Sequence, residues 1–177
     1  MRNVRVWDPF VRMFHWSLVI LFAANAIWTN PEKLPHHVIG YAILALVVLR
    51  VLWGFAGPRH ARFADFPPSP SAALDQVREI ATGARRVHLG HSPLGALMIY
   101  NMLATLVVIA VSGYMMTTVT WFGIEWVEEV HKAAVTWAEI SAVAHIAAVM
   151  LESRRLGVNL PRAMVTGTKK VHDPDHA

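Results

Sequence analysis

The sequence predicts an all-α integral membrane protein, a four-helix bundle that forms one membrane domain over residues 1–177 with both termini in the cytoplasm. Hydrophobic residues make up 55% of the chain and charged residues only 16%, which departs from the balance of a soluble globular domain. The apolar residues gather in four long runs, and the basic residues lie between particular runs. Together these three observations predict the fold class.

Each apolar run is long enough to cross a membrane as a helix. A helix rises about 1.5 Å per residue, so roughly 20 residues span the hydrocarbon core. Hydrocarbon offers the backbone no water, so runs of this length satisfy their hydrogen bonds internally as helices. The predicted spans cover residues 10–30, 36–55, 93–118 and 130–152.

The segments around the spans complete the predicted organisation. The first run is interpreted as a retained helix, because no small-residue cleavage site of a signal peptide follows it. Residues 56–92 form a long polar loop in which a short helix over 72–83 is expected near the membrane surface. Residues 153–177 are interpreted as a cytoplasmic tail, and its last part, "KKVHDPDHA" (residues 169–177), as solvated.

The distribution of charge predicts the orientation of the bundle. Arginine and lysine concentrate before the first span, in the loop 56–92 and after the fourth span. The positive-inside rule places these segments in the cytoplasm, so the chain is expected in a cytoplasmic membrane. The connection between the third and fourth spans then lies outside, and it carries Glu125, Glu128 and Glu129.

The absence of cysteine restricts the chemistry. Disulfides, thiolate metal sites, cysteine-ligated iron–sulfur clusters and thioether-attached haem are all excluded. A metal in this protein is therefore held by histidine, carboxylate or methionine.

Two histidines share one face of the fourth span. His131 and His145 are fourteen residues apart, which at about 100° per residue falls only some 40° short of four full turns. They are therefore separated by roughly 21 Å along the helix axis. Histidines inside a span usually face the bundle interior and mark a site, although a hydrogen bond to a neighbouring helix is the alternative for each of them.

Each of these histidines has a candidate partner at the same depth. His15 lies near the inner start of the first span, as His145 lies near the inner end of the fourth. His36 lies at the outer start of the second span, level with His131. The sequence therefore predicts two bis-histidine sites, one toward each surface of the membrane.

Haem fits two imidazoles better than a simple ion does. Zinc normally takes four ligands and calcium takes oxygen ligands, whereas haem iron takes two axial ligands and its porphyrin suits an apolar pocket. Gly40 follows His36 by four residues on the same face, where a missing side chain would let a porphyrin edge approach the backbone. Close helix packing is the alternative for this glycine.

Several motifs resemble a known family. They are "RVWDPFVRMFHW", "HHVIGYAILALVVLRVLWGFAGPRHARFADF", "LGHSP", "EEVHKAAV", "AHIAAVMLES" and "NLPRAMVTGTKK". They extend over nearly the whole chain and resemble the prokaryotic cytochrome b561 family, in particular the members related to the b-type cytochrome subunits of nickel–iron hydrogenases. The resemblance implies a four-helix bundle that binds two b haems.

The resemblance also implies particular ligands. Carried over by position, His15 and His145 ligate the inner haem iron, and His36 and His131 the outer. The family places its ligand four residues before the glycine of "GY", which favours His36 over the adjacent His37.

Two arginines are candidate partners of the haem propionates. Arg50 lies fourteen residues after His36, on the same face of the second span and near the inner surface. It is expected either to pair with a propionate or to extend to the interface. Arg12 is a candidate for the same role.

The expected function is electron transfer across the membrane between a redox partner protein and quinone. An acidic outer connection repels an anion such as superoxide and favours a protein with a basic docking surface, such as a c-type cytochrome or a dehydrogenase subunit. A superoxide:quinone oxidoreductase is one alternative, and a histidine-based metal-ion transporter is another. Glu139, midway along the fourth span, is expected to be a neutral acid bonded to a nearby helix, with a proton path for quinone chemistry as the alternative.

Overall fold

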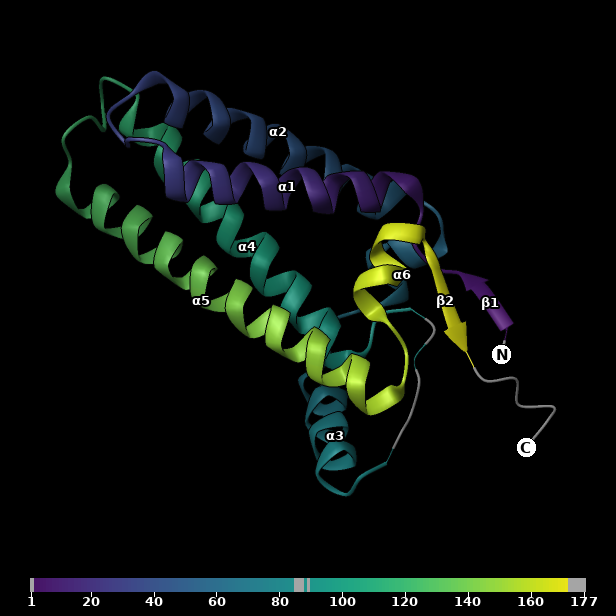
Figure 1. The fold of residues 1–177 in the computed structure, drawn as a ribbon. Coiled ribbons are helices and arrows are strands. Elements are labelled where there is room, and N and C mark those ends of the chain that lie inside the picture. Colours follow the sequence, from purple (N-terminus) through teal and green to yellow (C-terminus); the bar gives the residue numbers. More distant parts are fainter. Residues whose placement is uncertain (1, 85–87, 89, 172–177) are drawn as a thin grey trace. The chain divides into compact units, whose positions relative to one another are not determined.

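The computed structural model describes residues 2–84, 88 and 90–171. In this part of the chain, four helices are long and apolar enough to cross a membrane: α1 (Pro9–Trp28), α2 (Leu34–Ala56), α4 (Pro93–Met116) and α5 (Glu125–Leu156), as Figure 1 shows. The described residues are mostly helical. The predicted helical membrane protein is thereby confirmed.

Helix α5 extends beyond the predicted span at both ends and has 32 residues. Glu125 and Glu128 lie in its first turn, and Arg154 and Arg155 lie in its last. Negative charge at a helix N-terminus and positive charge at its C-terminus interact favourably with the helix dipole. The charged residues that flank the apolar run therefore continue the helix instead of ending it.

The contacts within the chain define two compact units, which are described separately. The first comprises Met1–Arg12, Trp53–Tyr100 and Val143–Ala177, and the second comprises Met13–Leu52 and Asn101–Ala142. Each long helix contributes residues to both units.

The second unit has an apolar core at the middle of its helices. Ile43, Val47 and Leu106 are its most buried members, and Val47 is only 1% exposed. Leu18 and Phe22 of α1 pack against them. The core therefore joins α1, α2 and α4.

Asn101 links α4 to α5 in the same unit. Its Nδ2 atom donates to Oγ of Ser141 at 2.9 Å, and its Oδ1 atom accepts from Nε1 of Trp137 at 2.9 Å. Both groups of the amide are thereby satisfied across a helix pair, as polar side chains within a membrane require.

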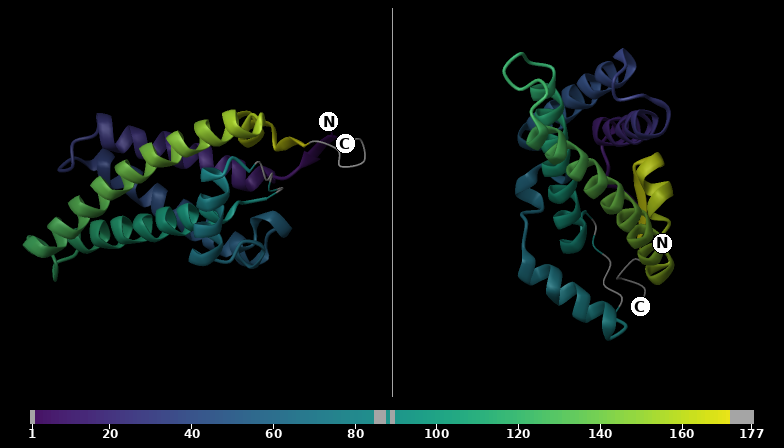
Figure 2. Two further views of the ribbon diagram at one scale, coloured as in Figure 1. Left: turned by 90° about the horizontal axis from the view of Figure 1, so that it is seen from below. Right: turned by 90° about the vertical axis from the view of Figure 1, so that its left-hand side faces the viewer.

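In the first unit, strand β1 (Arg2–Arg5) pairs antiparallel with strand β2 (Thr168–Val171), which follows the short helix α6 (Leu160–Thr166). Figure 2 shows the two strands in further views. Gly167 ends α6 with a left-handed φ of 82°, and its carbonyl accepts from the backbone N–H of Val6 at 2.9 Å. The expectation of a solvated tail is therefore wrong for residues 169–171, because backbone pairing was not visible in so polar a segment. The rest of that tail, residues 172–177, lies outside the described residues.

The loop between α2 and α4 contains the predicted short helix. Helix α3 (Pro70–Ala81) begins two residues before the predicted position, because Ser69 caps it by accepting from Ala72 N–H at 3.3 Å. Two short 3₁₀ turns precede it, η1 (Arg59–Ala61) and η2 (Phe63–Asp65).

Gly167 offers a test of the turn that joins α6 to β2. A Cβ atom there would lie 2.9 Å from the carbonyl oxygen of Trp7 and 3.1 Å from Nη1 of Arg12. Gly83 has a similar φ of 81°, but no atom lies within 4 Å of its Cβ position. Gly83→Ala should therefore cost only the left-handed backbone penalty of about 1–2 kcal/mol.

Gly167→Ala is expected to lower the free energy of unfolding by about 1–3 kcal/mol more than Gly83→Ala, because it adds a collision to the same penalty. Denaturation in detergent, followed by circular dichroism, measures the difference. Equal losses in the two variants would contradict the packing of Gly167 against Trp7 and Arg12.

Candidate functional site

Two of the histidines that the sequence singles out meet in the second unit. His36 lies at the start of α2 and His131 in the second turn of α5. Their ring centres are 6.5 Å apart, and the ring planes are inclined at 66°. The structure thus brings together the pair predicted for the outer site.

The His131 ring is held against α4. Its Nδ1 atom lies 3.0 Å from the carbonyl oxygen of Ile109 and 3.1 Å from Oγ of Ser112. Ser112 Oγ itself donates to the Val108 carbonyl at 2.6 Å, so its lone pairs face the imidazole. A Cβ atom at Gly113 would lie only 3.1 Å from Cε1 of His131, so the glycine allows this close approach.

The His36 ring is held by the segment that follows α1. Its Nδ1 atom lies 3.1 Å from Oγ1 of Thr29. Thr29 Oγ1 donates to the carbonyl oxygen of Asn25 at 2.6 Å, which leaves it to accept from the imidazole N–H. The hydrogen-bond network therefore places a proton on Nδ1 of His36 and, through the Ile109 carbonyl, on Nδ1 of His131.

With Nδ1 protonated, each ring has the lone pair of Nε2 available for a metal. Histidine ligands commonly donate their other ring N–H to a carbonyl or a hydroxyl in this way. A metal–imidazole bond is about 2 Å long. When two imidazoles bind one metal from opposite sides, their ring centres are separated by two such bonds plus the distance from each ligating nitrogen to its ring centre. The 6.5 Å between the ring centres of His36 and His131 is compatible with this separation. These residues therefore fit haem iron with two axial ligands.

There is open space beside Gly40, which follows His36 by four residues on α2. No atom lies within 4 Å of a Cβ built on this glycine. Close packing against another helix, the alternative interpretation, is therefore not what the structure shows. His37 lies beside His36, with ring centres 6.1 Å apart, but the ring that contacts His131 is that of His36.

The inner pair stays a prediction. His15 lies in the part of α1 that belongs to the second unit, with its ring edge-on to Trp16 at 5.1 Å. His145 is half-buried on α5 in a stretch that belongs to the first unit. Each residue is on the helix that the sequence predicts for it.

The two candidate arginines are placed differently. Arg50 is 3% exposed on α2, so its side chain is enclosed by protein. Arg12 donates from Nη2 to the carbonyl of Val165, which ties the start of α1 to α6 in the first unit. Arg12 therefore has a structural role in addition to the one that the sequence suggests.

Sequence reasoning missed the groups that orient the imidazoles. Thr29, Ser112 and Gly113 were not singled out, and the Ile109 carbonyl carries no side-chain signal at all. The pair Ser112–Gly113 within an apolar span was the available signal, because small and hydroxyl residues in membrane helices mark close contacts.

A second histidine cluster lies in the loop of the first unit. Nδ1 of His60 is 2.9 Å from Oδ2 of Asp65, and Nε of Arg59 donates to Oδ1 at 3.2 Å. Burial acts to raise the pKa of Asp65, but the bonds from His60 and Arg59 outweigh it and hold that pKa below its usual value. The ring of His91 lies 4.1 Å from that of Phe66 and 4.6 Å from that of Trp7.

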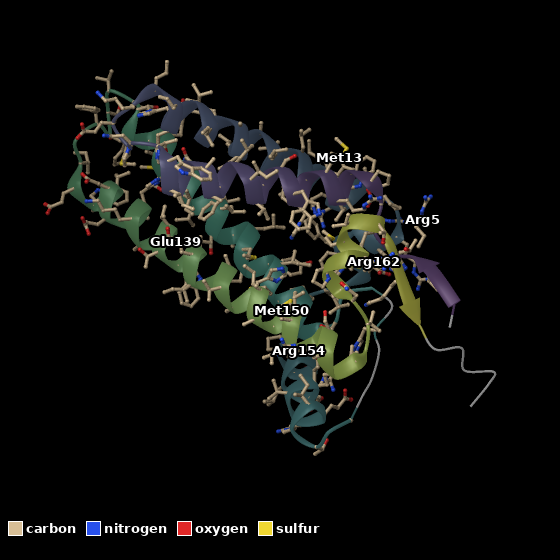
Figure 3. All side chains as sticks on the ribbon, in the orientation of Figure 1. Arg5, Met13, Glu139, Met150, Arg154 and Arg162 are labelled. Atoms are coloured by element: carbon tan, nitrogen blue, oxygen red, sulfur yellow. The ribbon has the colours of Figure 1, made fainter. Side chains whose placement is uncertain are left out.

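Glu139 lies on the exposed side of α5, midway along the helix (Figure 3). Among the residues that the structure describes, it makes no hydrogen bond or ion pair, so the expected bond to a nearby helix is not found there. Within the same residues, no group of three or more His, Asp or Glu side chains could hold a metal ion.

One comparison with known proteins identifies a family for this chain. No curated protein and no solved structure matches the chain. The model of the family described as prokaryotic cytochrome b561 matches residues 6–167, a range that contains all four predicted ligands and the four long helices. Since the match covers most of the sequence, the chain belongs to the prokaryotic cytochrome b561 family, whose members are b-type cytochromes of transmembrane electron transfer.

Proposed function

We propose that the chain is a dihaem cytochrome of the bacterial inner membrane that passes electrons between a redox partner protein and the quinone pool. The observation that carries this proposal is the pair of imidazoles, His36 and His131, whose rings lie 6.5 Å apart with both Nδ1 atoms hydrogen-bonded. Haem bound here would supply a one-electron carrier inside the membrane.

At the proposed outer site, neighbouring residues orient the two imidazole rings and leave space for the haem. The carbonyl of Ile109 and the hydroxyl of Thr29 hold the two rings and increase the basicity of their Nε2 atoms. The open space beside Gly40 suits the edge of a flat macrocycle. The apolar residues of the second unit would exclude water from it.

For the inner site we infer that His15 and His145 are the ligands. Support comes from α5, which runs as one helix from Glu125 to Leu156 and so carries His131 and His145 on nearly one face, roughly 21 Å apart along its axis. Arg50, enclosed by protein, is the candidate for pairing with a propionate, and Arg12 is the second.

The start of α5 suits a basic protein partner. The side chains of Glu128 and Glu129 are 55% and 65% exposed, and both contact Lys132, at 2.7 and 3.5 Å. With Glu125 included, three carboxylates face one ammonium, so the net charge there is negative. A basic docking surface on a c-type cytochrome or a dehydrogenase subunit would be attracted to it.

His131→Ala is expected to remove one haem and leave the other, so that the haem content per chain falls by half. His145→Ala should do the same for the other haem. Haem content and a potentiometric titration of each variant identify which centre is lost. If both variants lack the centre of the same potential, the assignment of these two ligands to different haems is wrong.

His36→Ala should lose the outer haem, whereas His37→Ala should keep full haem content, because the ring contact with His131 belongs to His36. The two variants differ by one position and control for each other. If only His37→Ala lost haem, the ligand would be His37 and not His36.

Thr29→Val removes the acceptor of the His36 N–H and should raise the midpoint potential of the outer haem, because a less basic imidazole stabilises ferric iron less. Thr105→Val is the control, since Thr105 Oγ1 bonds to the Asn101 carbonyl of its own helix, at 2.8 Å. Potentiometric titration in purified membranes measures both. An unchanged midpoint potential in Thr29→Val would show that Thr29 does not influence the haem through His36.

A further inference from the structure

Helix α3 carries an exposed apolar stripe. Leu74, Val77 and Ile80 are 52%, 47% and 37% exposed. They recur every three residues, so at about 100° per residue they cover an arc of roughly 120° on one side of the helix. An amphipathic helix in a globular domain normally buries such a stripe.

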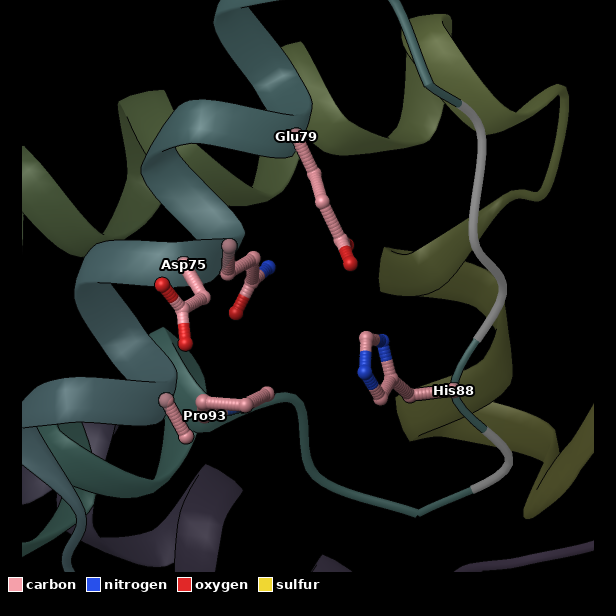
Figure 4. Close-up of a pocket in the computed structure, with 6 residues that line it drawn as sticks. Asp75, Glu79, His88 and Pro93 are labelled. Atoms are coloured by element: carbon pink, nitrogen blue, oxygen red, sulfur yellow. The ribbon is translucent and has the colours of Figure 1, made fainter.

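The opposite side of α3 is charged. Asp75 and Arg78 form an ion pair at 3.0 Å, with side chains that are 65% and 69% exposed. Asp75 and Glu79 line a small pocket together with His88 and Pro93, as Figure 4 shows. The two sides of the helix thus suit environments of different polarity.

A hydrogen bond connects α3 to the start of α4 within the first unit. Oε1 of the buried Gln76 accepts from the backbone N–H of Leu94 at 2.9 Å. Leu94 is the second residue of α4, so α3 lies beside the point where a membrane span begins.

The chain that follows α3 is tied down as well. Arg155, in the last turn of α5, donates to the carbonyl of Ala84. Lys169 donates from Nζ to the carbonyl of His88 at 2.6 Å, and burial holds the pKa of this lysine below its usual value although Glu152 acts in the opposite direction. The segment that contains α3 is therefore attached to the ends of two spans.

From this placement we propose that α3 is an interfacial helix that inserts Leu74, Val77 and Ile80 into the leaflet of the membrane at the start of α4. A helix bonded to the first turn of a span lies at the level of the lipid headgroups. Its exposed apolar stripe would then enter the leaflet that surrounds the start of α4, because α4 is itself a membrane span.

The charges beside the stripe agree with lipid as the occupant. Arg78 borders the stripe on the helix, and its side chain is 69% exposed. Exposed arginines next to an apolar face suit the anionic headgroups of a membrane surface. The proposal does not depend on the number of haems.

Site-specific labelling tests the proposal directly, because the chain contains no cysteine. Val77→Cys and Asp75→Cys each introduce one labelling position at an exposed site, on the apolar and the charged side respectively. Each full-length variant, with its haem spectrum checked, is labelled with a fluorophore and reconstituted into vesicles of phosphatidylcholine and phosphatidylglycerol.

The label at position 77 should be quenched several-fold more by a lipid-attached quencher than the label at position 75, and the order should reverse with aqueous iodide. Similar aqueous quenching at both positions would overturn the proposal. Protection of position 77 in native membranes but not in these vesicles would also overturn it, because the occupant would then be a protein.

Discussion

The absence of water from the hydrocarbon core is the constraint on which the rest of this structure depends. It requires the backbone of each span to be helical, and it penalises a polar side chain within a span that has no partner in protein. Ser112 and Thr105 bond to carbonyls of their own helix, and Asn101 uses both ends of its amide on α5. The imidazoles of His36 and His131 follow the same rule through Nδ1, which leaves Nε2 for a ligand.

The same constraint explains which parts of the fold were predictable. Hydropathy located the four long helices, because lipid selects residues by polarity over about 20 consecutive positions. It could not give the true length of α5, whose ends are stabilised by Glu125 and Arg155 through the helix dipole. Nor could it predict β2, since Thr168–Val171 joins a sheet through backbone groups that no side-chain pattern reports.

In the candidate site, the two histidines could be predicted from the sequence, but the groups that hold them could not. Helical periodicity and depth were enough to pair His36 with His131, and the structure places them together. The groups that hold these rings come from positions that periodicity does not mark, namely a residue after a helix end, Thr29, and a backbone carbonyl, that of Ile109. The helix carrying Ile109 supplies no ligand, so its Ser112–Gly113 pair was the signal that pointed to it.

The bond from His131 to the Ile109 carbonyl has one more consequence. That carbonyl belongs to the backbone of α4, and a carbonyl that accepts an additional hydrogen bond from a side chain shares its electron density between the helix and the imidazole. A small bend of α4 near Ile109 would change the length of this bond and with it the electron density on Nε2 of His131. The third span would thus have a means of tuning the proposed outer haem electronically, although it provides none of the four predicted histidine ligands.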